Sequence, residues 1–245
     1  MRACRFQSIC TPRRLAASTT MMLAILPTIS MFCGLPISFE KRDLLAEGHE
    51  IQSHAYSHRP LFGMDRAALR QELELSVKTV EDACGVRVTS FRAPDFSILS
   101  ENLWALETLT ELGFKIDSSI FPMRMKRYGI AGWANTPSRI TLPNGARLLE
   151  VPVAIWSVAG LRVPVAGGGY FRLLPQMLLS RALRSILAAN QPVIIYCHPY
   201  EFNPRELDEF RGKVPEFFPV YPEPRPCVVH RAGAPLVAGA AVWEV

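Results

Sequence analysis

The sequence Gly48-His49-Glu50-Ile51-Gln52-Ser53-His54-Ala55-Tyr56-Ser57-His58 carries two histidines four residues apart, His54 and His58. Residues 50–53 alternate polar and apolar after a glycine, which is typical of a short strand, so the pair follows a strand's carboxyl end. α/β folds place their chemistry there. This spacing lets both imidazoles face one divalent metal ion if the backbone coils. The other interpretation is two surface histidines in a loop, because the spacing alone is common.

Strand-like and helix-like segments alternate along the rest of the chain. The strands expected from short apolar runs are residues 28–34, 86–91, 114–116, 148–153 and 192–197. The helices expected from apolar periodicity are residues 65–83, 100–113 and 175–189. Strands that alternate with helices favour a parallel α/β sheet, closed or nearly closed into a barrel. One barrel is compatible with a chain of 245 residues.

Composition and charge exclude several classes of protein. Hydrophobic residues make up 49% of the chain and charged residues 20%, so global disorder is excluded. The net charge of +5 is concentrated in four arginines near the N-terminus, Arg2, Arg5, Arg13 and Arg14. The remainder is close to neutral, so no nucleic-acid surface is expected. The six cysteines form no CxxC pair, and Cys197 is interpreted as a small buried hydrophobe.

The two ends of the chain do not follow the strand–helix pattern. Residues 15–39 contain no charge and follow the arginines, like a signal peptide or signal anchor, although Pro27 and Pro36 make a poor membrane span. Residues 28–34 are better interpreted as a buried strand, which leaves residues 1–27 as a leader or a non-native segment. Residues 217–245 are rich in Pro, Ala and Gly and are expected to form an irregular tail. Membrane association through the N-terminus is one expectation, and the location, bacterial cytoplasm or cell envelope, stays open.

Four motifs together resemble a known family. Gly48 to His58 resembles the zinc-binding motif of the polysaccharide deacetylases, the chitin deacetylase and NodB-like carbohydrate esterases. Phe91-Arg92-Ala93-Pro94-Asp95-Phe96-Ser97-Ile98 resembles their arginine–proline motif, and Phe114-Lys115-Ile116-Asp117-Ser118-Ser119 their aspartate motif. Ile194-Ile195-Tyr196-Cys197-His198-Pro199 resembles their final histidine motif. Ala166-Gly167-Gly168-Gly169-Tyr170-Phe171-Arg172 is similar to a segment of a bacterial branch associated with exopolysaccharide synthesis.

The resemblance covers roughly residues 28–216 and implies a fold and a reaction. The implied fold is a distorted (β/α) barrel of the NodB-homology type, incomplete at both ends. The implied activity is hydrolysis of N-acetyl groups on a polysaccharide or oligosaccharide, with a divalent metal as cofactor and zinc as the expected ion.

The resemblance also implies roles for single residues. His54 and His58 would be metal ligands, and His198 would be the general acid. Asp117 would hold that imidazole in its protonated form, and Arg92 would orient a catalytic aspartate. Without the resemblance, Asp117 is equally an ordinary helix cap, and Arg92 and His198 are interpreted as surface residues.

Two further aromatic residues are candidates for sugar contact. Three consecutive glycines precede Tyr170 and Phe171, and no Lys-Ser/Thr pair follows, so the segment is no phosphate loop. A tight backbone there would present the two rings to a sugar, although ordinary core packing is equally compatible.

The sequence departs from the family at one motif. The family carries two adjacent aspartates on its first strand, one as base and one as metal ligand, whereas this chain has no Asp-Asp and no acidic residue before Glu40. Asp43, the nearest candidate, lies in a predicted helix. Three hypotheses therefore stay open: a metal-dependent N-deacetylase impaired by this loss, a catalytically inactive carbohydrate-binding remnant, and a membrane-anchored structural protein.

Overall fold

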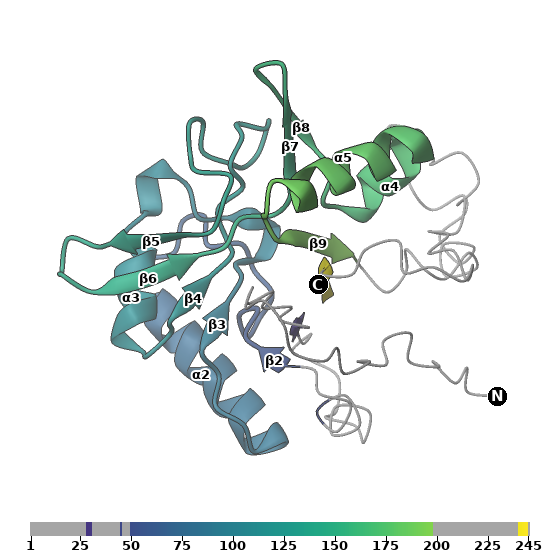
Figure 1. The fold of residues 1–245 in the computed structure, drawn as a ribbon. Helices are drawn as coiled ribbons and strands as arrows, with labels where there is room; N and C mark the ends of the chain where they lie inside the picture. The colour runs from purple at the N-terminus through teal and green to yellow at the C-terminus, as the bar shows by residue number, and fades with distance from the viewer. Residues whose placement is uncertain (1–27, 31–44, 46–49, 198–239, 245) are drawn as a thin grey trace, which may run out of the picture.

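The computed structural model describes residues 28–30, 45, 50–197 and 240–244, which form an α/β fold (Figure 1). The strands are β1 (Thr28–Ser30), β2 (Glu50–Gln52), β3 (Ser90–Phe91), β4 (Ile116–Asp117), β5 (Ser138–Thr141), β6 (Arg147–Glu150), β7 (Ile155–Val158), β8 (Leu161–Pro164), β9 (Val193–Cys197) and β10 (Ala240–Glu244). The helices are α2 (Arg66–Cys84), α3 (Ala105–Glu111), α4 (Gly168–Leu173) and α5 (Gln176–Ala188). Two short 3₁₀ turns, Pro94–Phe96 and Ser100–Asn102, lie between β3 and α3.

Most strands run parallel and are connected around an irregular barrel. One sheet has the order β2-β1-β10-β9 and the other the order β3-β4-β6-β5, in which only β5 is antiparallel to its neighbour. A parallel bridge between Ser53 and Phe91 joins β2 to β3. After β6, the N–H of Val151 donates to β4 at 2.8 Å and the N–H of Ala154 donates to β9 at 2.9 Å. Hydrogen-bonded backbone therefore runs from β9 through β10, β1, β2, β3, β4 and β6 and returns to β9.

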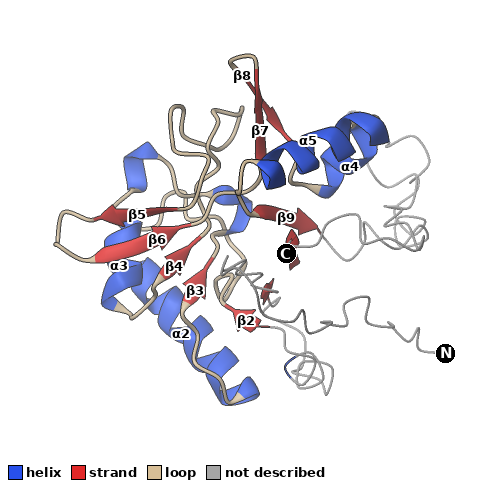
Figure 2. Ribbon diagram, viewed as in Figure 1, coloured by secondary structure: helices blue, strands red, loops and turns tan. Residues whose placement is uncertain are grey.

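The described helices cover the strands from two sides, as Figure 2 shows. α2 and α3 lie beside β3, β4 and β6, whereas α4 and α5 lie beside the β7–β8 hairpin and β9. Two apolar clusters fill these contacts: one is centred on α2, α3 and β3, and the other on α5, β7 and β9. No helix in the described part of the chain has the length and apolar character needed to cross a membrane.

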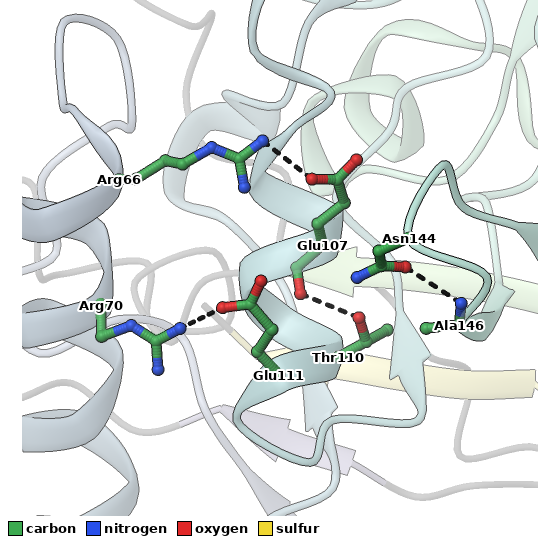
Figure 3. Close-up of polar contacts among 7 residues, drawn as sticks. All are labelled: Arg66, Arg70, Glu107, Thr110, Glu111, Asn144 and Ala146. Atoms are coloured by element: carbon green, nitrogen blue, oxygen red, sulfur yellow. Dashed lines mark hydrogen bonds and ion pairs between the residues drawn. The ribbon is translucent and has the colours of Figure 1, made fainter.

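Surface ion pairs join α2 to α3 (Figure 3). Arg66 donates to Glu107 at 2.8 Å, and one turn along α2 Arg70 donates to Glu111. The Arg66 guanidinium also lies over the Trp104 ring, 5.3 Å from its centroid. The side chains of Arg66, Arg70 and Glu111 are 41–52% exposed, so these ion pairs add little stability beside the apolar contacts between the helices.

The expected alternation of strands and helices is confirmed, with most boundaries shifted inward. Asp65 caps α2, where its carboxylate accepts the Ala68 N–H at 2.8 Å, and Gly85 ends the helix at φ 68°. The strand expected over residues 86–91 pairs only at Ser90 and Phe91. The helix expected from residue 100 begins as a 3₁₀ turn and becomes α-helical only at Ala105.

The predicted tail includes a strand. β10 lies within residues 217–245 and pairs in parallel with both β1 and β9. Part of the segment expected to be irregular therefore supplies a strand of the barrel. Its Pro-, Ala- and Gly-rich composition concealed this, because a strand buried between two neighbours needs only a short apolar run.

Leu73 and Leu75 on α2 provide a matched test of the core. Leu73 is fully buried, whereas Leu75, two residues along the same helix, is 46% exposed. We expect Leu73→Ala to lower the free energy of unfolding by about 2–5 kcal/mol, because it leaves a cavity between α2 and the sheet. Leu75→Ala changes it by less than about 0.5 kcal/mol. Urea unfolding measures both, and equal losses would contradict this packing.

Candidate functional site

Polar residues lie in a row at the carboxyl ends of adjacent strands. His54 follows β2, Arg92 follows β3, and Asp117 and Glu150 are the last residues of β4 and β6. The register aligns them, since Asp117 pairs with Phe91 on one side and with Glu150 on the other. All four side chains are buried, with at most 2% of each exposed. The strand ends of one parallel sheet thus gather an imidazole, a guanidinium and two carboxyls in the interior.

The histidine pair is held by a loop and not by a helical turn. The rings of His54 and His58 have centroids 4.9 Å apart at an interplanar angle of 65°. Ala55 and His58 adopt positive φ values of 66° and 56°, and these left-handed residues replace the helical coil that the four-residue spacing suggested. The prediction that the imidazoles face a common point is compatible with this loop, which carries backbone strain of the kind found at functional sites.

A backbone carbonyl fixes the tautomer of His54. Its Nδ1–H donates to the Arg92 carbonyl oxygen at 2.7 Å. The lone pair is therefore on Nε2, the nitrogen that a metal would bind.

Helix α2 anchors the histidine loop from below. The hydroxyl of Ser53 is hydrogen-bonded to that of Ser76 at 2.8 Å, and the buried carboxylate of Glu72 accepts the Ser57 N–H. Sequence reasoning missed Glu72 and Ser76. Their signal is present, however, because both polar residues share the apolar face that α2 presents to the sheet.

The guanidinium of Arg92 is enclosed by the protein. Its Nε–H donates to the Ser118 carbonyl at 3.1 Å, and Nη2 donates to the Ser118 hydroxyl at 2.6 Å. Burial lowers the pKa of Arg92 to about 9, and the negative charge of Asp117 opposes this shift. The expectation of an ordinary surface arginine is therefore wrong, because Arg92 is only 1% exposed.

Asp117 and Glu150 form a buried pair of carboxyls. Asp117 accepts hydrogen bonds from the N–H and the hydroxyl of Ser119, at 3.0 and 2.6 Å, and Glu150 accepts the Ile120 N–H at 3.3 Å. Burial raises the pKa of both, and the charge of Asp117 raises that of Glu150 further. The alternative of a helix cap at Asp117 is wrong, because the next element after β4 is the strand β5, and the buried partner Glu150 was missed. Its signal was an acidic residue that ends an apolar strand.

An aromatic cluster continues from Arg92 toward Tyr170. The Phe96 ring lies 5.6 Å from the Arg92 guanidinium and 5.0 Å from the Tyr196 ring. Tyr128 also packs on Phe96 and is hydrogen-bonded to Tyr196 and Tyr170. Burial raises the pKa of Tyr170 to about 12, so its hydroxyl is neutral at physiological pH. Asp95 and Phe96 have φ values of 54° and 49°, a second strained turn beside the row.

A glycine places Tyr196 in this cluster. A Cβ on Gly167 would lie 2.6 Å from the Tyr196 ring, so any other residue would displace the tyrosine. Tyr170 and Phe171, expected to contact sugar, are both half-buried, and Phe171 packs on the cluster around α5, β7 and β9. Tyr170 thus adjoins the row, and the role of both rings stays a prediction.

Other expected site residues lie elsewhere. His198 is outside the described residues, directly after β9. Within the residues that the structure describes, no three His, Cys, Asp or Glu side chains are grouped so as to hold a metal ion. His54 and His58 could supply two ligands to a metal ion. The described residues supply no third His, Cys, Asp or Glu ligand beside them.

Two family models match separate parts of the chain. Residues 40–116, which hold the histidine pair and Arg92, match the polysaccharide deacetylase family model. Residues 118–214 match a second family model, a domain of unknown function (DUF3473). Comparison with curated proteins finds no match.

The solved structures that resemble this chain are distant from it in sequence. A putative polysaccharide deacetylase from Mycobacterium smegmatis is 22% identical (TM-score 0.45), over 65% of this chain and 53% of that one. A probable polysaccharide deacetylase from Pseudomonas aeruginosa PAO1 is 17% identical (TM-score 0.39), over 60% and 43%. A CE4 family pseudoenzyme from Bacillus anthracis is 12% identical (TM-score 0.37), over 84% and 48%. The chain thus spans about half the length of these structures.

Glu72 tests how α2 holds the histidine loop. We expect Glu72→Ala to speed amide hydrogen exchange at Ser57 about 10–100-fold, because a hydrogen bond to a charged group contributes about 1.5–3 kcal/mol. Glu74→Ala is the matched control, since Glu74 lies one position beyond Leu73 on the exposed face of the helix. Unchanged protection of Ser57 in Glu72→Ala would show that the loop holds its shape without α2.

Proposed function

We propose that this chain is a metal-dependent hydrolase that removes N-acetyl groups from a polysaccharide. The observation that carries the proposal is the contact between the His54 and His58 rings, with His54 hydrogen-bonded to the Arg92 carbonyl, in a segment that matches the polysaccharide deacetylase model. Surface histidines in a loop would not share buried contacts with an arginine from the next strand. The reaction adds water across the amide and yields acetate and a free amine.

The metal would be held by His54 and His58, and zinc is the ion that two imidazoles favour. A bound zinc ion supplies a Lewis acid that polarises an acyl oxygen and lowers the pKa of a bound water. The protein's own part is to present the two rings in fixed orientation. The Arg92 carbonyl does this for His54, and the Glu72 carboxylate does it for the backbone between them.

Other residues would bind the sugar and move protons. His198 directly follows β9 in the sequence and would protonate the departing amine. Asp117 and Arg92 place a buried carboxylate and a fixed positive charge near the reacting groups. Tyr170, with Phe171, would stack on the sugar, because a neutral tyrosine ring offers both an apolar face and a hydroxyl.

A second candidate function is carbohydrate binding without catalysis. It is favoured by the absence of an Asp-Asp pair in the sequence and by the absence of a three-ligand group among the described residues. Two imidazoles and water hold zinc less firmly than three protein ligands, and loss of a general base slows hydrolysis about 10²–10⁴-fold. Acetate release distinguishes the two functions.

The decisive assay measures acetate released from an N-acetylated oligosaccharide by the full chain with zinc. We expect release that a chelator abolishes and that zinc restores. His54→Ala and His58→Ala should each lower it at least about 100-fold, since even outer-shell changes at metal sites have effects of about 10–100-fold. Glu74→Gln, on the exposed face of α2, should match the wild type. Oligosaccharide binding without acetate release would instead support the inactive, sugar-binding function.

A further inference from the structure

We propose that Glu150 carries the single proton of a buried carboxyl pair with Asp117 and is a positioning residue for the row of site residues. The proton assignment starts from the geometry of the buried pair and does not depend on the proposed deacetylation, whereas the positioning role in catalysis rests on it. Neither the sequence motifs nor the family comparisons assign a role to Glu150.

The first step concerns the atoms of the pair. Asp117 and Glu150 are register partners on β4 and β6, and neither side chain is exposed. Ser119 donates to both oxygens of Asp117, and Ile120 donates to Oε1 of Glu150. Oε2 of Glu150 receives no hydrogen bond from the described residues, although it is buried. An O–H on Oε2 that donates to Asp117 satisfies this atom.

The second step concerns charge. Two charged groups face Glu150: Asp117 on β4 and Arg92 at the end of β3. Tyr196 on β9 interacts electrostatically with Arg92. Two ionised carboxyls beside one guanidinium would leave a net negative charge in the interior. One proton on the pair makes the cluster neutral, which a site without solvent requires. Burial and the Asp117 charge raise the pKa of Glu150 well above its usual range, so Glu150 is the carboxyl that holds the proton.

The third step links this proton to the histidines. Asp117 lies beside Arg92, and the Arg92 carbonyl accepts the Nδ1–H of His54. A second negative charge at Glu150 would draw the guanidinium away from its bonds to Ser118. The backbone that orients His54 would move with it. Glu150 therefore acts through Asp117 and Arg92 and does not itself touch the metal or the sugar.

The proton is tested by NMR on the full chain labelled with carbon-13 at glutamate side chains. We expect one protonated carboxyl at neutral pH, absent in Glu150→Gln. In Asp117→Asn the same carboxyl should ionise at lower pH, because the neighbouring negative charge is gone. A spectrum in which every glutamate is ionised at neutral pH would overturn the proposal, and so would a protonated signal that persists in Glu150→Gln.

Stability against pH gives a second readout. The pKa of Glu150 is higher in the folded protein than in the unfolded chain. The protonated Glu150 therefore contributes its full stabilisation below the unfolded pKa, and this stabilisation is lost as pH rises through the folded pKa. Wild-type stability should therefore fall as pH rises from the unfolded pKa through the raised folded pKa of Glu150, and Glu150→Gln, which is neutral at every pH, should lack this fall. Parallel pH curves for the two would contradict the assignment.

The positioning role is tested at Arg92. Its Nε–H resonance, followed by nitrogen-15 NMR, should move with the ionisation of Glu150 in the wild type and stay constant over the same pH range in Glu150→Gln. A merely structural glutamate would leave this resonance unchanged in both, which would overturn the positioning role. Acetate release over the same range should lose its alkaline fall in Glu150→Gln. If the wild type releases no acetate, the proposed function is wrong. The two NMR experiments still test the proton on Glu150 and its effect on Arg92, because neither depends on activity.

Discussion

Burial of the Arg92 guanidinium determines which polar and charged groups must surround the site. Arg92 has no access to water, so the protein must supply both its hydrogen-bond acceptors and its counter-charge. Ser118 provides the acceptors from the end of β4, and the Asp117 carboxyl beside it provides the charge. A buried ion pair adds little stability over an apolar core, but the loss of one partner is severe because it leaves the other charge alone. The arrangement therefore fixes how β3, β4 and β6 meet.

Very short strands can position the site because each contributes its last residues. β3 and β4 pair over only two residues, yet their register determines which side chains share the carboxyl edge. The turns that leave these strands are strained at Ala55, His58, Asp95 and Phe96. That strain is held by contacts from outside the strands, notably from Glu72 on α2 and from the aromatic cluster. The positioning of the histidines is thus a property of the tertiary structure and not of the four-residue spacing alone.

The sequence predicted the elements better than their connections. Apolar periodicity located α2 and α5 within a residue or two, because their buried faces repeat along many turns. Arg92, Asp117 and the histidine pair were found because they sit in short motifs. Glu72 and Glu150 were missed because their hydrogen-bond partners, Ser57 and Ile120, lie 15 and 30 positions away, which no local pattern reveals. β10 was missed because five residues between two strands carry no period.

A double-mutant cycle between Arg92 and Asp117 tests most directly whether the site depends on this buried charge. The free energy of unfolding is measured for the wild type, Arg92→Gln, Asp117→Asn and the double variant at neutral pH. The account predicts that the double variant is more stable than the sum of the single losses implies, by about 1–3 kcal/mol, because removal of both charges leaves neither unpaired. Losses that add to within about 0.5 kcal/mol would contradict it.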